Sequence, residues 1–234
     1  MKGAEPASAL LPSMGSMALV MVPILVLSAS THLEPEQGFA LAWASYMAAF
    51  LGWASLLWAW KSGKVSLSLR HVLLGAAVLR LVLLPSEPIF SDDIWRYVWD
   101  GRVQLAGVNP YQFAPADLAL NAVRDGLWSR INHPEVPTIY PPVSQIVFAF
   151  SALFDAGLVP LRVVMSVCEF LALGAVWRLA ALGGGAVSEG RKVWLALLVV
   201  WNPLMAVEFV GSGHLDALAI APLCLLYTSD AADE

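Results

Sequence analysis

The chain has 234 residues, of which 59% are hydrophobic and 13% charged, with a formal net charge of −5. Soluble domains carry about 25% charged residues, so the composition excludes an ordinary soluble fold and favours a polytopic membrane protein. The acidic balance and the missing basic stripe argue against nucleic acid as a partner. Cys168 and Cys224 lie in apolar runs, so neither a disulfide framework nor a metal cluster is supported.

Residues 1–84 contain three apolar runs of the length that a membrane-spanning helix needs, about 20 residues. The runs are Leu10–Ser30, Gly38–Trp60 and Leu67–Leu84. The first run follows Lys2 and ends in Ser-Ala-Ser, which also fits a cleaved signal peptide. Glu5 and Pro6 before it, and its length, favour an uncleaved anchor. The expected fold class is all-α, a polytopic transmembrane helical bundle.

Four more apolar runs follow residue 142, and we expect transmembrane or re-entrant helices within residues 143–227. The runs are Val143–Val159, Val163–Leu182, Val193–Phe209 and an incomplete one from about Leu215 to Tyr227. The last run, of about 13 residues, is too short to cross, so it is either interfacial or truncated, and truncation is preferred. Residues 228–234 are expected to be a non-native tail.

The basic residues near the span ends predict the orientation of the chain. The connection Thr31–Gln37 carries acidic residues without Lys or Arg, whereas Lys61–Ser66 carries two lysines. This places the amino terminus in the cytoplasm and residues 85–142 outside a bacterial-type inner membrane. If Val143–Val159 crossed fully, Arg191 and Lys192 would fall outside, so a re-entrant segment there is favoured.

Residues 85–142 form the one substantial polar loop, since positions 85–141 hold eleven charged residues and positions 1–84 hold eight. Ser91 is a suitable N-cap for a juxtamembrane helix, with Asp92 and Asp93 in its first turn. Three- and four-residue spacing puts Asp93, Arg96, Tyr97 and Asp100 on one face.

The same helix has an apolar face and a glycine that bear on its position and length. Ile94, Val98 and Leu105 form a face suited to lying on the membrane surface. Gly101 is expected to weaken or end the helix. Within the spans, Arg80 is expected to snorkel or to pair inside the bundle, and Glu169 to find a partner outside its own helix.

Each polar feature also has a plain structural explanation. The two aspartates satisfy a helix cap, and Asn109-Pro110-Tyr111 is an ordinary turn. Tyr140 and the two prolines after it fit a polyproline start to the next helix. His214 and Asp216 can pair with each other, or with arginines, for structural reasons.

Taken together and in order, the motifs resemble the GT-C superfamily of integral membrane glycosyltransferases, in its bacterial polyprenol-phosphomannose-dependent mannosyltransferase-like branch. The motifs lie between residues 91 and 216, and the first 84 residues match only as generic spans. They are Ser91-Asp-Asp-Ile-Trp-Arg-Tyr-Val-Trp-Asp-Gly-Arg102, Gly107-Val-Asn-Pro-Tyr111, Thr138-Ile-Tyr-Pro-Pro142, Trp201-Asn-Pro-Leu204 followed by Glu208, and Gly213-His-Leu-Asp216. The superfamily carries more spans, so the chain is expected to be an amino-terminal fragment.

The resemblance implies inverting transfer of a hexose, mannose by preference, from a polyprenyl-phosphate sugar donor to an extracytoplasmic glycan or lipid acceptor. It implies a general base at Asp93 or Asp92, with Asp93 preferred. Arg96 and Arg102 are the expected partners of the leaving phosphate. The residues expected to contact substrate are Arg96, Tyr97, Asp100, Arg102, Asn109, Tyr111, Tyr140, Glu208, His214 and Asp216.

No cofactor and no metal ligand are predicted, because Asp92-Asp93 is not a D-x-D, although metal dependence varies across the superfamily. Two other functions fit the composition. One is a polytopic transporter or flippase, against which the missing internal symmetry argues. The other is a non-catalytic membrane subunit of envelope glycan assembly, which predicts that both aspartates can be replaced without loss of sugar transfer.

Overall fold

The computed structural model describes residues 7–88, 90–182 and 185–233, and the regular elements in those ranges are helices. Three of them are long and apolar enough to cross a membrane by length and composition: α1 from Ser13, α2 and α6. A bent pair, α7 with the α8–η3 segment, makes a fourth candidate. The predicted all-α polytopic architecture is confirmed.

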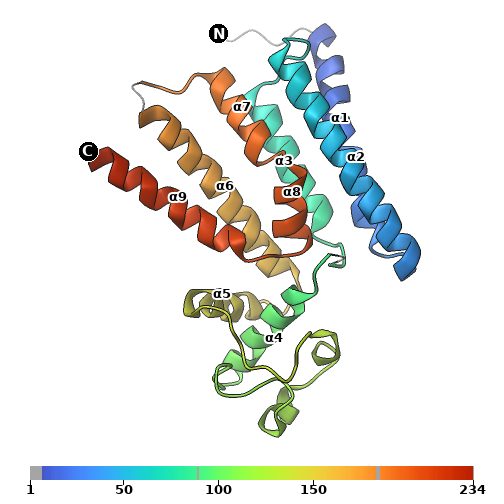
Figure 1. The fold of residues 1–234 in the computed structure, drawn as a ribbon, viewed down its shortest axis with the longest axis vertical. Helices are drawn as coiled ribbons and strands as arrows, with labels where there is room; N and C mark the ends of the chain where they lie inside the picture. The colour runs from blue at the N-terminus through green and yellow to red at the C-terminus, as the bar shows by residue number, and fades with distance from the viewer. Residues whose placement is uncertain (1–6, 89, 183–184, 234) are drawn as a thin grey trace.

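The first three helices run antiparallel along the bundle (Figure 1): α1 (Ala7–Ser30), α2 (Pro35–Lys61) and α3 (Leu69–Leu83). Helices α1 and α2 approach closely where Gly52 faces Leu19, since a Cβ on Gly52 would lie 2.1 Å from the Leu19 carbonyl oxygen. Small residues permit such contacts between membrane helices. Ser68 caps α3 by accepting a hydrogen bond from the His71 backbone N–H at 3.4 Å.

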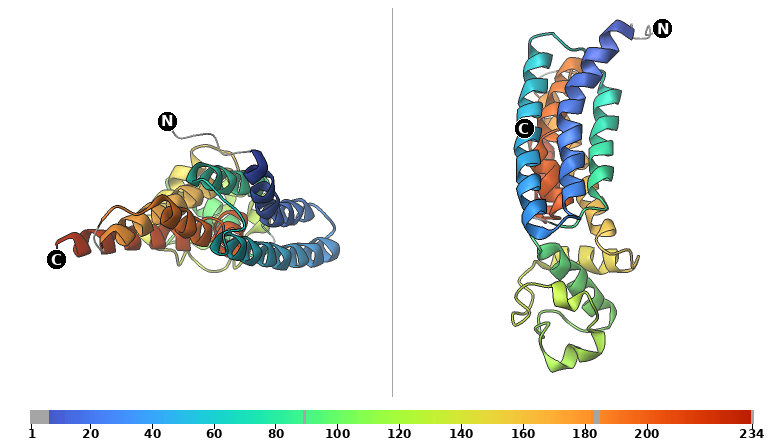
Figure 2. Two further views of the ribbon diagram at one scale, coloured as in Figure 1. Left: turned by 90° about the horizontal axis from the view of Figure 1, so that it is seen from above. Right: turned by 90° about the vertical axis from the view of Figure 1, so that its right-hand side faces the viewer.

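The polar loop folds as a compact unit beyond one end of the bundle (Figures 1 and 2). It contains α4 (Asp93–Leu105), two short 3-10 helices, η1 (Leu118–Val123) and η2 (Trp128–Arg130), and α5 (Pro142–Ala152). In Figure 1, α5 lies across the end of the bundle instead of along it. With 11 residues it is too short to cross a membrane.

The apolar run Val143–Val159 is therefore not one helix, as its hydropathy predicts, but the end of α5 and a turn. Asp155 and Gly157 adopt positive φ angles of 44° and 59° in that turn, which ends α5 and redirects the chain. Helix α6 (Val159–Leu182) then runs back along the bundle.

The last span is broken. Helix α7 (Glu189–Val199) meets α8 (Pro203–Met205) and the π-helical segment η3 (Ala206–Gly211) at a bend of 53°. Asn202 caps the second half by accepting a hydrogen bond from the Leu204 N–H at 3.0 Å. The predicted run Val193–Phe209 is thus two helices joined by a Pro-containing bend.

Helix α9 (Asp216–Asp233) follows η3 and continues through the predicted tail. The side chains of residues 228–233, and Glu234 as a whole, lie outside the described part of the chain, so the non-native tail stays a prediction.

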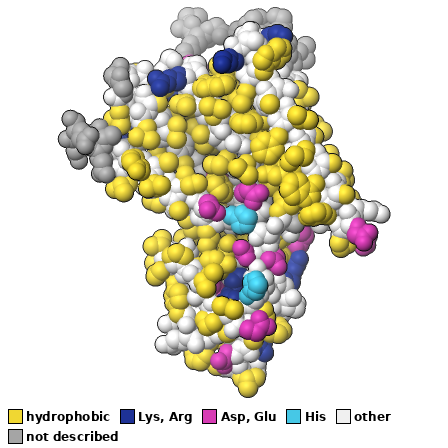
Figure 3. Space-filling model, viewed as in Figure 1, with side chains coloured by type: hydrophobic (Ala, Val, Ile, Leu, Met, Phe, Trp, Pro, Cys, Tyr) yellow, Lys and Arg dark blue, Asp and Glu magenta, His cyan; other side chains and the backbone are white. Residues whose placement is uncertain are grey.

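The two ends of the bundle differ in charge. Figure 1 shows the α2–α3 and α6–α7 connections at one end, and the polar loop with the η3–α9 connection at the other. Lys61, Lys64, Arg191 and Lys192 therefore lie at the end opposite the loop, where Figure 3 shows Lys and Arg side chains. Because α5 does not cross, all four fall on the same side, in agreement with the positive-inside rule.

Buried charges tie the bundle together. Arg80 on α3 forms a bidentate pair with Glu169 on α6, with its Nε 3.0 Å from Glu169 Oε2, so both predicted intramembrane charges are paired. Arg162, on α6, donates to the carbonyl oxygens of Leu84 and Ser86 at 2.8 and 2.5 Å and of Gly211 at 2.5 Å. One guanidinium therefore anchors both the start of the loop and the end of η3.

Candidate active site

The two aspartates stand where α4 begins. The helix starts at Asp93, with Asp92 in the N-cap position in place of the predicted Ser91. The Ser91 hydroxyl still accepts a hydrogen bond from the Asp93 N–H at 3.3 Å. Asp92 is exposed, whereas Asp93 is partly buried. The side chains of this first turn therefore differ in surroundings although they are adjacent in sequence.

Helix α4 is amphipathic, but its apolar face packs against protein instead of lying on a membrane surface, as the sequence predicts. Ile94 is 0% exposed and Val98 is 5% exposed, and both lie in a core cluster with Phe148 of α5 and Leu161 of α6. Of the three predicted residues, Leu105 is exposed. This packing fixes the direction in which Asp93 projects.

Two cavities meet at Asp93 and Tyr140. The larger, of about 580 Å³, lies between the loop and the start of α9. Its lining residues are Asp93, Tyr97, Tyr140, Pro141, Val143, Ser144, His214, Leu215, Asp216, Leu218, Ala219 and Pro222. Figure 3 shows acidic and His side chains gathered at this level, in a hollow between the bundle and the loop.

The smaller cavity, of about 310 Å³, is built by the loop. It is lined by Asp93, Arg96, Asn132, His133, Val136, Pro137, Ile139 and Tyr140. Asp93 and Tyr140 are the residues that both linings share, whereas Asp92 belongs to neither. The Asp93 carboxylate can therefore contact groups in either cavity.

Tyr97 and Tyr140 form an aromatic wall between α4 and the start of α5. Their rings meet edge to face with centroids 4.8 Å apart, and Tyr97 stacks on Phe148 at 4.8 Å. Burial, reinforced by the charge of Asp93, raises the pKa of Tyr140 to about 12. Burial likewise raises the pKa of Tyr97. Both hydroxyls stay protonated at neutral pH and are available as hydrogen-bond donors.

His214 and Glu208 form a pair on the far wall of the larger cavity. The His214 Nδ1 lies 2.9 Å from Glu208 Oε2, and the His214 backbone N–H donates to the Glu208 carbonyl oxygen at 2.9 Å. The hydrogen bond to Glu208 raises the pKa of His214, with smaller contributions from Asp93 and Asp216, while burial opposes it. The imidazole therefore holds its proton to higher pH than a free histidine.

Arg96 and Asp100 share one helix face with Asp93, as predicted, but they face the interior of the loop. Arg96 Nε donates to Asp100 Oδ1 at 2.9 Å, and both side chains are at most 5% exposed. Arg96 also donates to the carbonyl oxygen of Val136 at 2.8 Å, and Asp100 accepts from Gln145 at 3.1 Å. These contacts organise the loop, and only Arg96 reaches a cavity wall.

Three other predicted residues lie away from both cavities. Arg102 pairs with Asp125 and, at 3.3 Å, with Asp155 on the outside of the loop. Asn109 accepts a hydrogen bond from the Tyr111 N–H at 3.0 Å, which is the ordinary turn that the sequence also allows. Tyr111 touches the site only through its hydroxyl, which donates to the Tyr140 carbonyl oxygen at 2.5 Å.

Asn132 is a site residue that sequence reasoning missed. Its side-chain amide donates to Asp92 Oδ1 at 2.7 Å and to Asp93 Oδ1 at 2.6 Å. It lies some 40 positions from the aspartates, in an irregular segment with no helical or strand periodicity to connect them. His133 beside it, with a positive φ of 45°, is the local mark of an unusual backbone.

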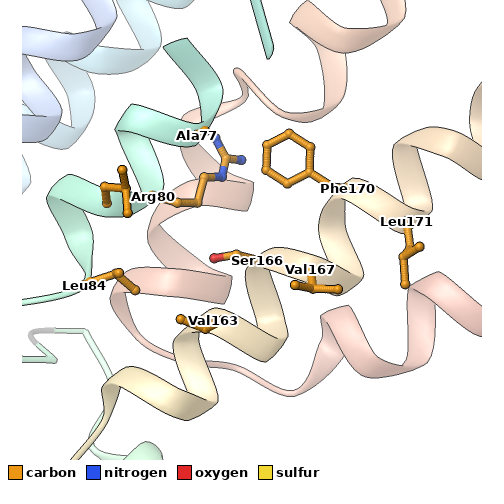
Figure 4. A pocket seen from close by; sticks show the side chains of 9 residues that line it. Ala77, Arg80, Leu84, Val163, Ser166, Val167, Phe170 and Leu171 are labelled. Carbon is orange, nitrogen blue, oxygen red and sulfur yellow. The ribbon is translucent and has the colours of Figure 1, made fainter. Parts of the chain in front are cut away.

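A third cavity, of about 440 Å³, opens on the side of the bundle between α3 and α6 (Figure 4). Its wall is apolar apart from Arg80 and Ser166, and it shares no lining residue with the two cavities at Asp93. As for metals, the described residues contain no group of three or more His, Cys, Asp or Glu that could hold an ion. The prediction of a metal-free site remains a prediction.

Fold and site together define an all-α polytopic membrane protein with a carboxylate-centred site at one end of its spans. The chain belongs to the family described as alpha-(1->6)-mannopyranosyltransferase, N-terminal domain, whose model matches residues 7–229. The resemblance inferred from the motifs is thereby confirmed.

A curated relative is alpha-(1->6)-mannopyranosyltransferase B of Corynebacterium glutamicum, which is 26% identical over 168 residues. The match covers 68% of this chain and 26% of the relative, so the chain spans about a quarter of the length of that protein. No solved structure matches the chain.

Proposed function

We propose that the protein transfers a mannosyl group from a polyprenyl-phosphate donor to a hydroxyl of an extracytoplasmic glycan, with Asp93 as general base. The observation that carries the proposal is that Asp93 borders both cavities at the end of the spans. A base that removes the acceptor proton must lie between the acceptor and the reacting carbon of the donor.

The larger cavity suits the donor. Leu218, Ala219 and Pro222 of α9 carry its wall into the apolar part of the molecule, whereas Asp93 and Tyr140 stand at its polar end. A polyprenyl phosphate needs this combination, because its tail stays in lipid while its sugar is at the interface. The smaller cavity, built by the loop, then receives the acceptor sugar.

In the proposed step, the acceptor oxygen forms a bond to the anomeric carbon as its proton passes to the Asp93 carboxylate. The bond between that carbon and the phosphate oxygen breaks, and its electron pair leaves with polyprenyl phosphate. Single displacement inverts the anomeric configuration, so an α-linked product requires a β-linked donor. No covalent carboxylate intermediate is involved.

His214 is the proposed partner of the leaving phosphate, in place of the predicted Arg96 and Arg102. It is the basic residue in the lining of the larger cavity, and Glu208 helps to keep it protonated. Arg96 is committed to Asp100, and Arg102 lies on the outside of the loop. A charge-assisted hydrogen bond from His214 would stabilise the phosphate as the bond to carbon breaks.

The test is sugar transfer by the complete protein in membranes, with radiolabelled polyprenyl-phosphate mannose and a mannan acceptor. Asp93→Asn is expected to lower the rate by about 10²–10⁴-fold, the usual contribution of a general base. The matched control Asp92→Asn, an exposed neighbour outside both cavities, should keep most of the activity. Wild-type activity in Asp93→Asn would overturn the assignment, and lipid translocation without sugar transfer would favour a flippase.

A further inference from the structure

The amide of Asn132 holds two neighbouring carboxylates at once. Its Nδ2 lies 2.7 Å from Asp92 Oδ1 and 2.6 Å from Asp93 Oδ1. A side-chain amide nitrogen has two N–H donors, so each carboxylate receives one. Both are charge-assisted hydrogen bonds of good length. This contact offsets the repulsion between two adjacent negative charges at the start of α4.

The same contact divides the work of the Asp93 carboxylate between its two oxygens. Oδ1 is engaged by Asn132, and no residue in the described part of the chain donates a hydrogen bond to Oδ2. A carboxylate fixed through one oxygen cannot swing freely about its side-chain torsions. The second oxygen is then available, in a defined direction, to a group in one of the two cavities.

Asn132 is itself held in place by the buried ion pair of α4. Arg96 donates to the carbonyl oxygen of His133 at 3.3 Å and to that of Val136 at 2.8 Å, so the segment after Asn132 is bound to the helix that carries Asp93. Asp100 fixes the orientation of Arg96 at 2.9 Å. The left-handed backbone of His133 turns the chain at this point.

We propose that Asn132 is a positioning residue, which orients Asp93 so that its free oxygen accepts the proton of the acceptor hydroxyl. The proposal rests on the function proposed above. It assigns Arg96 and Asp100, one helical turn away, to the support of Asn132 and not to substrate. The site is then a chain of contacts that runs from Asp100 through Arg96 and the 133–136 backbone to Asn132 and Asp93.

The kinetic test compares Asn132→Ala with wild type in the complete protein. We expect kcat to fall by roughly 10- to 100-fold, the cost of misplacing a reacting group, while KM for the donor changes less than twofold. Asn121→Ala, an exposed asparagine of the same loop, is the control and should retain full activity. A change in KM alone, with kcat intact, would overturn a positioning role.

Asn132→Asp adds a readout that a merely structural role would not move. The introduced carboxyl can donate a hydrogen bond only while it is protonated, and its charged form repels both aspartates. The ratio of kcat for Asn132→Asp to kcat for Asn132→Ala should therefore rise as the pH is lowered. A ratio that does not depend on pH would contradict the proposal.

A chemical measurement separates this proposal from the function on which it rests. A water-soluble carbodiimide with an added amine labels accessible carboxyl groups, and peptide mass spectrometry reports the labelling of Asp93. Asn132→Ala should raise that labelling several-fold, and Asn121→Ala should leave it unchanged. Unchanged labelling in Asn132→Ala would overturn the contact. Increased labelling without sugar transfer by wild type would keep the contact and reject the transferase.

Discussion

His214 owes its protonation to one neighbour, Glu208, which lies 2.9 Å away on the π-helical segment η3. Because the pKa of His214 is raised in the folded protein, the pair stabilises the fold fully below the ordinary pKa of histidine, about 6.5. That contribution is lost as the pH rises through the raised pKa. The ion pair therefore ties the wall of the larger cavity to pH.

His214→Gln should lower the melting temperature by roughly 1–3 °C at pH 6, the range expected for a partly exposed ion pair. At pH 9 wild type and variant should melt together, since His214 is then neutral in both the folded and the unfolded chain. Fluorescence-detected melting in detergent measures both values, and His32→Gln, an exposed histidine, is the control. A difference of the same size at both pH values would contradict the role of Glu208.

At the level of residues, the sequence predicts the chemistry of the site better than its geometry. Spacing along a helix places Asp93, Arg96 and Asp100 on one face, and the structure agrees. Whether that face meets substrate or protein depends on Gln145 and on the backbone of residues 133–136, which are distant in sequence. The same distance hides Asn132, because an asparagine in an irregular segment carries no periodic signal.

Helix α4 illustrates how an element departs from its own propensity. Gly101 is expected to weaken or end the helix, yet α4 continues to Leu105. The reason is the contact with α5: a Cβ on Gly101 would lie 2.3 Å from the Phe148 carbonyl oxygen and 3.0 Å from the Ala152 Cβ. The residue permits close packing of two helices, and that tertiary gain outweighs its poor helix propensity.

Gly101→Ala should therefore destabilise the protein although alanine favours a helix. We expect a cost of about 1–3 kcal/mol, as for overpacked cores, together with loss of sugar transfer, because α4 and α5 carry Asp93 and border both cavities. Gly174→Ala on α6, where a Cβ would meet no atom within 4 Å, is the control and should be neutral or stabilising. Thermal melting of the two variants measures the difference, and equal stability would contradict the close approach.

The whole molecule depends on whether the chain crosses the membrane between the loop and α6. Hydropathy predicts an apolar run at Val143–Val159 but does not show that α5 stops at Ala152 and packs against α4. The spans α1, α2 and α6 are predictable, because their length and composition alone meet the requirement of a bilayer. The path between them is set by packing against the polar loop.

Single cysteines test this path in a variant in which Cys168 and Cys224 are replaced by serine. Lys64→Cys and Arg191→Cys should react with a membrane-impermeant maleimide only after the membrane is opened, because both residues lie at the basic end of the bundle. Leu118→Cys, 78% exposed in the loop, should react in intact cells. Opposite behaviour of Lys64→Cys and Arg191→Cys would show that α5 crosses.

The π-helical segment η3 also makes the site sensitive to chain length. Ser212 donates its N–H to the Val207 carbonyl oxygen at 2.7 Å, five residues back, so this turn holds one residue more than an α-helix does. Deleting one residue would restore α-helical winding and rotate everything after it by about 100°. His214 and Asp216 would then leave the wall that faces Asp93. Among relatives with this site, we expect the segment to vary by substitution and not by insertion or deletion.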